Sequence, residues 1–221
     1  MTRNQILIVG GGQGIGKAIA AAHADRATVW TRRTGVDAAD EASLARAFAT
    51  FHARHGAPFA LVLCPGDFSE QPLLGTDAAT YRALIRSNVD TVFHTLQAVL
   101  PTMVAAGRPG RVVLFAAAGV DKNRGMPRAP VYFAAKAAVV QMARSLALEV
   151  AAHRITVNVV APGLIDHPDS HQDSQLRLLP RVPAGRLGTT ADVVGMVDYL
   201  LSPAADYVTG QVLTIDGGLQ S

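Results

Sequence analysis

The stretch ILIVGGGQGIG, from Ile6 to Gly16, decides how this chain folds. Its apolar residues form a short buried strand, and the glycine-rich turn that follows opens directly into a helical segment from Ile15 to Ala24. Glycines allow positive φ angles and close approach of the backbone, while a helix N-terminus presents free N–H groups to an anion. The pattern predicts a site for the pyrophosphate of a dinucleotide, although a tight structural turn would leave the same signature. The candidate residues are Gly10, Gln13, Gly14, Ile15 and Gly16.

Strand-like and helix-like segments alternate along the rest of the chain. Further strands are predicted at Ala27 to Thr31, Phe59 to Cys64, Arg111 to Ala116, Ile155 to Gly163 and in GQVLTIDGG, and helices at Glu41 to His55, within Thr76 to Ala106, at Val131 to Ala151 and at Thr190 to Leu201. Apolar β-branched runs between helices are typical of parallel sheets covered on both faces. We therefore predict a single α/β domain over residues 1–221, a Rossmann-type doubly wound parallel sheet with helices on both faces.

Two segments depart from a regular alternation. Only TRRTGV separates the second strand from Asp37, which is too short for a crossover helix, so we expect that helix to be missing or reduced. The polar segment from Asp166 to Gly185 is expected to be a mobile loop and to cover the substrate.

Composition excludes several functional classes. The formal charge is +3 and the pI about 9.3, yet the arginines are scattered and aromatic residues make up only 5%, so we expect no nucleic-acid partner. No continuous apolar run reaches the ~18 residues that span a bilayer, so no membrane is expected. A single cysteine, Cys64, precludes an internal disulfide and suits the cytoplasm. We expect anionic small molecules as partners and no metal.

The end of the second strand carries Arg32 and Arg33 and no acidic residue until Asp37. An acid at this position would bind the adenosine ribose hydroxyls, whereas two guanidinium groups suit a 2′-phosphate. The pair favours NADPH over NADH, unless both arginines are simply solvated.

The sequence YFAAK places Tyr132 and Lys136 at helical spacing i and i+4, on one face of the predicted helix. A nearby ammonium favours the phenolate, so the tyrosine could exchange protons nearer neutral pH. The spacing alone also arises by chance. No serine or threonine occurs between Thr102 and Ser145.

Together these motifs resemble the short-chain dehydrogenase/reductase family over nearly the whole chain. The family's glycine pattern falls on Val9, Gly10, Gly14 and Gly16, its aspartate near adenine on Asp37, its structural asparagine on Asn88, and its YxxxK on Tyr132 and Lys136. The segment ITVNVVAPGLI matches the strand and turn beside the nicotinamide, with Pro162, Gly163 and Ile165, and YVTGQVLTIDGG matches the last strand.

The resemblance assigns a role to each of these residues. Tyr132 is then the proton donor to a substrate oxygen, Lys136 holds the nicotinamide ribose and lowers the pKa of Tyr132, and Asn88 supports a water that relays protons to Lys136. An asparagine inside a helix could instead merely fix a kink. Relatives commonly form homo-oligomers through the two long helices and the last strand, so a dimer or tetramer is expected.

Three departures from the family pattern stand out. Its NNAG motif reads LCPG here, ending at Gly66, and its threonine after the PG turn is replaced at about His167. Its catalytic serine falls on or near Ala117. A side chain from Asp121, Lys122 or Asn123 could fill that gap, although charged loop residues are more often solvated.

These observations support three hypotheses. The first is an NADPH-dependent reductase of a ketone or aldehyde that uses Tyr132 as proton donor. The second reduces a conjugated C=C or C=N bond, as in enoyl or pteridine substrates, where the missing serine matters less. The third is a non-catalytic NADP(H)-binding sensor or partner protein.

Overall fold

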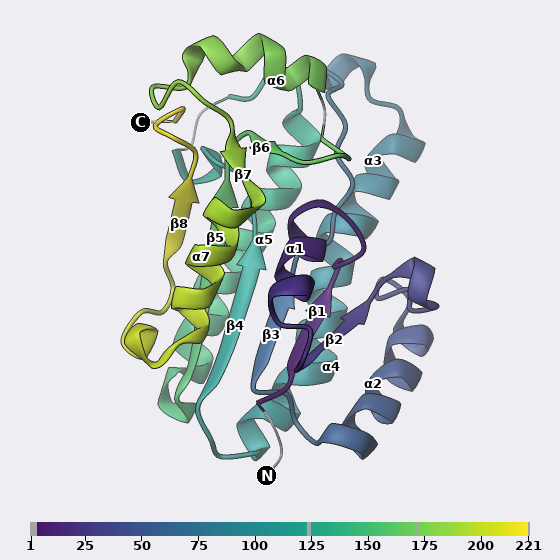
Figure 1. Cartoon of the computed structure of the whole chain (residues 1–221). Coiled ribbons are helices and arrows are strands. Elements are labelled where there is room, and N and C mark those ends of the chain that lie inside the picture. Colours follow the sequence, from purple (N-terminus) through teal and green to yellow (C-terminus); the bar gives the residue numbers. More distant parts are fainter. Residues whose placement is uncertain (1–3, 123–124, 171, 221) are drawn as a thin grey trace.

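The computed structural model describes residues 4–122, 125–170 and 172–220. Its centre is a six-stranded sheet in the order β2-β1-β3-β4-β5-β8, and every neighbouring pair is parallel (Figure 1). The strands are β1 (Ile6–Val9), β2 (Ala27–Trp30), β3 (Ala60–Leu63), β4 (Gly110–Phe115), β5 (Ile155–Pro162) and β8 (Val212–Ile215). A separate short pair joins β6 (Ile165–Asp166) to β7 (Gly188–Thr189).

The direction in which the sheet grows changes between β1 and β3. From β1 the chain first adds β2 on one side, and then adds β3, β4, β5 and β8 in turn on the other. This is the doubly wound arrangement that the sequence predicts. In such sheets ligands bind outside the carboxyl ends of the strands, at the point where the strand order reverses. The fold therefore predicts a binding site at the carboxyl ends of β1 and β3.

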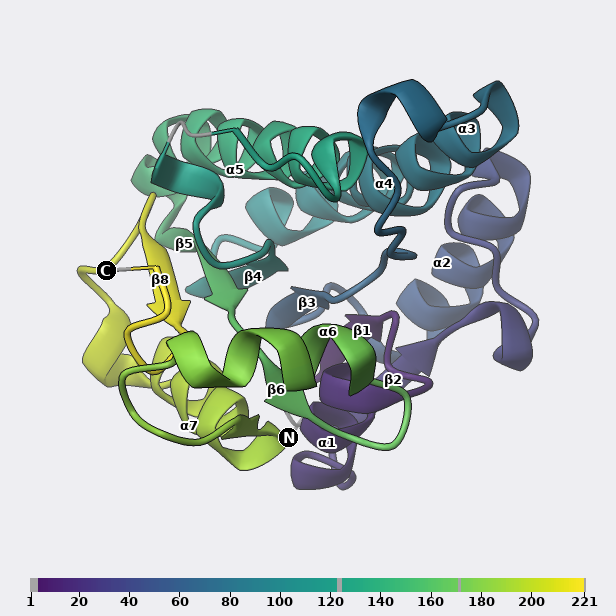
Figure 2. The same cartoon turned by 90° about the horizontal axis from the view of Figure 1, so that it is seen from above.

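Helices cover both faces of the sheet, as Figure 2 shows. One face carries α2 (Glu41–His55), α4 (Thr91–Ala105) and α5 (Pro130–Val150), and the other carries α1 (Gly14–Ala22) and α7 (Thr190–Leu201). The helix α3 (Ala78–Ile85) leads through one π-helical turn, Arg86–Asp90, directly into α4. The alternation of strands and helices in the sequence thus becomes three layers.

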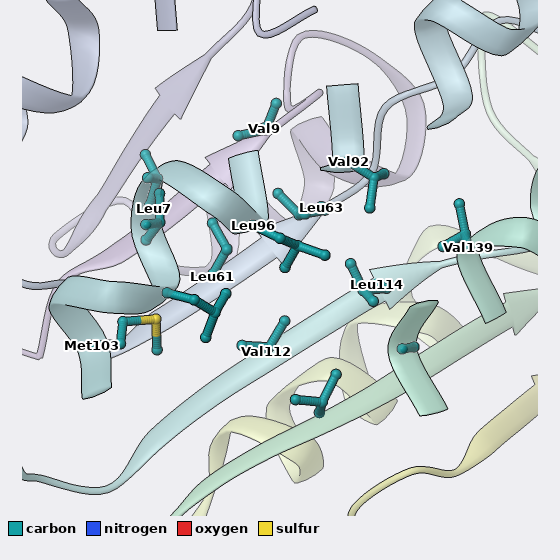
Figure 3. Close-up of a cluster of buried hydrophobic side chains, with 14 of the residues drawn as sticks. Leu7, Val9, Leu61, Leu63, Val92, Leu96, Met103, Val112, Leu114 and Val139 are labelled. Carbon is teal, nitrogen blue, oxygen red and sulfur yellow. The ribbon is translucent and has the colours of Figure 1, made fainter. Parts of the chain in front are cut away.

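Two hydrophobic clusters fill the space between these layers. Side chains of β1, β3 and β4 meet those of α4 and α5 on one face, where Leu7, Leu61 and Leu114 are fully buried (Figure 3). On the other face Ile6, Ile8 and Val62 pack with α1 and α7. Because successive residues of β1 and β3 point to opposite faces and both faces are covered, these strands read as continuous apolar runs.

The chain leaves the edge strand β2 through a short turn, and α2 then forms the crossover to β3. A single 3-10 turn, Arg32–Thr34, follows β2, and Gly35 with φ of +82° ends it. Thr31 and Thr34 cap the turn reciprocally, each side chain accepting the other's backbone N–H. No α-helix lies between β2 and Asp37 among the described residues, in agreement with the short spacing, and α2 begins only at Glu41.

The segment 166–185 is not the plain loop that its polarity predicts. It contains α6 (Gln172–Leu178) and a following 3-10 turn, Leu179–Arg181. The side chain of Gln175 is buried and donates to the carbonyl of Ile165 at 2.8 Å, which ties the helix to the fold. Tertiary contacts therefore order a polar segment whose own sequence has little apolar periodicity.

The helix α5 and its continuation, Pro130–His153, are long and apolar enough to cross a bilayer, with a mean hydropathy of 1.2. The expectation from continuous apolar runs did not single it out, because Lys136 and Arg144 interrupt the sequence. Here the helix packs on the sheet through Val139, Val140 and Ala143, all buried. A core helix of this kind passes the same test of length and hydropathy.

Candidate active site

A large cleft opens at the carboxyl ends of the strands. The β1–α1 turn, the ends of β2 and β3, the start of α5, the segment after β5, and α6 all line it. Every residue predicted to bind the cofactor lines this cleft. These are Gly10, Gln13, Gly14, Ile15, Gly16, Arg32, Arg33, Asp37, Gly66, Tyr132, Lys136, Pro162, Gly163 and Ile165.

The glycine turn is packed too closely for side chains. Gly10 has a φ of +90°, and a Cβ there would lie 2.6 Å from the carbonyl carbon and oxygen of Cys64. A Cβ at Gly16 would lie 2.5 Å from the carbonyl oxygen of Gly10. The turn brings the N-terminus of α1 into the cleft, and Gln13 at its N-cap forms no side-chain cap within the described chain. These backbone N–H groups suit a phosphate.

His167 lies against this turn. Its Cε1 would be 3.0 Å from a Cβ at Gly14, and its Nδ1 is buried without a hydrogen-bond partner among the described residues. In the sequence this histidine replaces the family's threonine and could line the pocket, although a lone histidine in a polar loop is more often on the surface. Only the return of the chain after β5 across the end of α1 brings it into the cleft.

Arginines gather at the β2 end of the cleft. Arg32 and Arg33 both line it, and the Arg32 guanidinium lies 3.6 Å from the Asp67 carboxylate. Asp37 accepts hydrogen bonds from Arg86 at 2.7 Å and from the backbone N–H of Ala39 at 3.1 Å. Although burial favours its neutral form, these bonds hold the pKa of Asp37 below its ordinary value. Arg33 forms no ion pair within the described part of the chain, which leaves its charge available to an anion.

Tyr132 and Lys136 meet at the start of α5, one helical turn apart. The Lys136 Nζ donates to the carbonyls of Pro65 at 3.1 Å and Phe115 at 3.2 Å, and lies 5.7 Å from the centre of the Tyr132 ring. The edge-to-face contact of Phe68 with Tyr132, at 4.9 Å between ring centres, holds the phenol in place.

The pKa of each of these two groups is shifted by burial. Burial lowers the pKa of Lys136 to about 8 and raises the pKa of Tyr132 to about 12. The second shift is opposite to the lowering expected from the neighbouring ammonium. Desolvation of the phenolate outweighs the attraction of Lys136, whose charge is already shared with two carbonyls.

Asn88 lies in the π-helical turn between α3 and α4 and is fully buried. Its Nδ2 donates to the carbonyls of Asp67 and Leu84, both at 3.0 Å, while its Oδ1 has no partner among the described residues. A Cβ at Gly66 would lie 2.0 Å from that Oδ1 and 3.1 Å from the Lys136 Nζ. Asn88 therefore fixes a turn of the backbone and also presents an unpaired oxygen close to Lys136.

The segment after β5 forms the wall opposite α5. Pro162 pairs with Ile215 of β8, and Gly163 donates from its backbone to the carbonyl of Ile215 at 2.9 Å. A Cβ at Gly163 would lie 2.6 Å from the Cβ of Asp216, so this position requires glycine. Ile165 is buried in β6.

The wall beyond β4 carries methyl groups where a polar side chain is expected. Ala116, Ala117 and Ala118 are all buried and line the cleft. Asp121 and Lys122 do not fill the gap, because both are exposed in a 3-10 turn and neither lines the cleft. Asn123, the third candidate, lies outside the described residues.

An ionic contact holds α6 against the loop after β3. The Glu70 carboxylate binds the Arg177 guanidinium and accepts from the Ser174 hydroxyl at 2.6 Å. Burial opposes ionisation, but these two hydrogen bonds hold the pKa of Glu70 below its ordinary value. Neither the glutamate nor its partners belong to a motif, and 104 residues separate Glu70 from Ser174, so the sequence could not reveal this contact.

Comparison with known proteins agrees with this geometry. The family model described as enoyl-(acyl carrier protein) reductase matches residues 15–220. A short-chain type dehydrogenase/reductase from Mycobacterium ulcerans superimposes with a TM-score of 0.88 and 27% identity, covering 100% of this chain and 90% of that one. The chain belongs to the short-chain dehydrogenase/reductase family. The family is one of oxidoreductases.

Other relatives within the family have different substrates in their names. A 3-oxoacyl-acyl-carrier-protein reductase of Escherichia coli is 32% identical, over 96% of both chains. A sorbitol dehydrogenase of Cereibacter sphaeroides is also 32% identical, over 96% of this chain and 95% of its own. A gluconate 5-dehydrogenase from Burkholderia cenocepacia, solved with NADP and tartrate, has a TM-score of 0.85 and 30% identity, covering 99% of this chain and 96% of that one.

Proposed function

We propose that this protein is an NADPH-dependent reductase of a ketone or aldehyde, in which Tyr132 donates the proton. The observation that carries the proposal is the pair Tyr132 and Lys136 in one cleft with the glycine turn, with Lys136 held by the carbonyls of Pro65 and Phe115. The cofactor, when bound, supplies the hydride. The chain's own residues bind it, orient the substrate and deliver the proton.

The cleft fits a dinucleotide diphosphate. At Gly10 and Gly16 a side chain would overlap the backbone, and the uncapped N-terminus of α1 offers N–H donors for the pyrophosphate. Pro162, Gly163 and Ile165 would form the wall beside the nicotinamide. The cleft therefore has a phosphate-binding end at α1 and a chemical end at α5.

Arg32 and Arg33 are proposed to bind the 2′-phosphate of NADPH. Both line the cleft beyond β2, and Asp37, the nearest acid in sequence, is engaged with Arg86. Its negative charge is therefore balanced and would not repel a phosphate. Asp37 itself would lie beside the adenine.

Burial gives Tyr132 and Lys136 complementary protonation states. With its pKa raised to about 12, Tyr132 carries its proton at neutral pH and can donate it. Lys136, with its pKa lowered to about 8, is mostly an ammonium there, and stabilises the phenolate left behind. The same ammonium would hold the nicotinamide ribose.

Asn88 is proposed to support the return of a proton to Lys136. Its buried Oδ1 lacks a partner within the described residues, and an unpaired buried acceptor commonly marks a water site. A water bound to Oδ1 and to the carbonyls near Lys136 would connect the ammonium with solvent. The kink at the π-helical turn is then the means by which Asn88 is positioned.

We also propose a cytoplasmic homo-oligomer, a dimer or tetramer. The family commonly assembles through helices that correspond to α4 and α5, and both expose large apolar side chains here, Phe93 and Leu148. Leu148 is 85% exposed, and covering it would stabilise an interface.

Reduction of a conjugated C=C or C=N bond is the second candidate function, because Ala117 supplies no hydroxyl for a ketone oxygen. The experiment measures the loss of NADPH absorbance with diketones, quinones, aldehydes, acetoacetyl thioesters, enones and dihydropteridines. Tyr132→Phe is the control, because the ring keeps its contact with Phe68. Turnover that disappears in the control supports a reductase, and the best substrate identifies the bond. Tight NADPH binding without turnover on any substrate would favour a sensor instead.

A further inference from the structure

Hydride transfer to a carbonyl carbon places negative charge on the carbonyl oxygen. Hydrogen-bond donors aimed at that oxygen lower the barrier, and loss of one donor costs on the order of 10² to 10³ in rate. In the proposed reaction Tyr132 is one donor. The adjacent wall, formed by Ala116, Ala117 and Ala118, offers only methyl groups at its side chains. A second donor must come from elsewhere in the fold.

Gln220 lies beside this apolar wall. It lines the cleft, and its carboxamide packs on Gly119, two residues after Ala117. A Cβ at Gly119 would be 3.0 Å from both the Cδ and the Oε1 of Gln220, so only glycine leaves room for the amide. Met126, which also lines the cleft, closes the other side of the same small space.

Hydrogen bonds fix the backbone around Gln220, whereas the oxygen of its side-chain carboxamide has no partner within the described residues. The Asp216 carboxylate accepts from the backbone N–H of Gly218 at 2.9 Å and from that of Gln220 at 2.8 Å. The Oε1 of Gln220 is buried and has no hydrogen-bond partner among residues 4–122, 125–170 and 172–220. Because this oxygen has no partner, no hydrogen bond within the described chain fixes which of the two amide atoms occupies its place.

Three other polar side chains of the described cleft are already engaged or lie elsewhere. Ser174 donates to Glu70, and Gln175 donates to the carbonyl of Ile165. His167 also has an unpaired buried nitrogen, but its ring lies against Gly14 at the phosphate end. Gln220 is the group placed next to the alanine wall.

We infer that Gln220 is a catalytic residue that donates a hydrogen bond from Nε2 to the substrate carbonyl oxygen, in place of a hydroxyl at position 117. The inference rests on the proposed reductase function. The last torsion of a glutamine side chain is broad, so a half turn exchanges Oε1 and Nε2 without moving the rest of the residue. The transferred proton still comes from Tyr132; the amide only stabilises charge.

The test compares Gln220→Leu with Gln220→Glu on the best substrate found with the wild-type enzyme. Leucine removes both polar atoms, whereas glutamate keeps the shape and removes the N–H donor. We expect both variants to lose about 10² in kcat, with NADPH affinity and melting temperature unchanged. Gln211→Leu is the matched control, because this exposed glutamine lies at the amino end of β8 and its side chain, within the described residues, binds only the Thr209 carbonyl.

A restored hydroxyl gives a second, independent readout. In Ala117→Ser the serine should take over the hydrogen bond, so that adding Gln220→Leu to it costs less than about threefold in kcat. This non-additivity is expected only of groups that donate a hydrogen bond to the same oxygen atom. If Gln220 had a merely structural role, Gln220→Leu would lower kcat by the same factor in the Ala117→Ser protein as in the wild-type protein.

The outcomes separate the two proposals. If Tyr132→Phe abolishes turnover but both Gln220 variants retain kcat within twofold, the role of Gln220 is refuted and the reductase stands. If Gln220→Leu lowers kcat by the same factor with and without Ala117→Ser, the proposal that both side chains bind the substrate carbonyl oxygen is refuted as well. Absence of turnover in the wild-type protein on every substrate would refute the reductase itself, and with it the role of Gln220.

Discussion

The turn at Gly66 offers the sharpest test of how the site is built. Gly66 has a φ of +134°, and an added Cβ would lie 2.0 Å from Oδ1 and 2.7 Å from Cγ of Asn88. Asn88 cannot move away easily, because its Nδ2 is held by the carbonyls of Asp67 and Leu84. We therefore expect Gly66→Ala to displace Asn88 or the turn that carries the carbonyl of Pro65.

The loss of folding stability expected for Gly66→Ala has two parts. A side chain at positive φ costs roughly 1 to 2 kcal/mol, and overpacking of a buried site typically adds 1 to 3 kcal/mol. Gly66→Ala should thus lower the free energy of unfolding by about 2 to 5 kcal/mol. Gly35→Ala is the matched control, because Gly35 also has a positive φ, +82°, but a Cβ there would meet nothing within 4 Å. That variant should lose about 1 to 2 kcal/mol.

Urea unfolding followed by the fluorescence of Trp30, the only tryptophan and 5% exposed, measures both variants. Removing the clash with Asn88→Ala should recover at least about 1 kcal/mol relative to the sum of the two single changes. A Gly66→Ala protein no less stable than Gly35→Ala, with additive effects in the double variant, would refute the close packing of Gly66 against Asn88.

Three further predictions concern the cleft. Arg33→Ser should weaken NADPH binding about tenfold and leave NADH binding nearly unchanged, because a charged hydrogen bond to the 2′-phosphate contributes on the order of 1.5 kcal/mol. Titration of nucleotide fluorescence measures both affinities, and equal losses for the two nucleotides would contradict this role. Because the pKa of Lys136 is lowered to about 8, kcat/KM should be high below pH 8 and fall as the ammonium is lost above it, and Lys136→Arg should move the fall to higher pH. Glu70→Gln removes the charge that holds Arg177 and should raise KM for substrate several-fold with little change in NADPH affinity, while an unchanged KM would mean that this contact does not position α6.

Much of the fold could be read from the sequence because its signals are local. The apolar run Ile6 to Val9 is buried on both faces of a parallel sheet, and the helices Glu41–His55 and Thr190–Leu201 begin and end where their sequences indicate. The length of the segment between β2 and Asp37 alone predicted that it lacks an α-helix, and among the described residues it has only a 3-10 turn. The segment 166–185 was the exception, since α6 is fixed by contacts with residues distant in sequence.

The predicted cofactor residues come together because each motif follows a strand, and all parallel strands end at the same edge of the sheet. The electrostatic environment was not predictable in this way. Spacing placed Lys136 beside Tyr132 and indicated a lowered pKa for the phenol, but burial raises that pKa instead. Desolvation depends on everything packed around a group, which no pair of positions in a sequence records.

The sequence by itself determined the order of strands and helices, the glycine turn at Gly10 to Gly16, and the spacing of Tyr132 and Lys136, since each depends on neighbours within a few residues. Only the tertiary structure decided that His167 lies on Gly14, that Glu70 holds α6, and that Gln220 lies beside the alanine wall. These contacts join residues about 100 or more positions apart, and they exist only because the chain returns repeatedly to the same edge of the sheet.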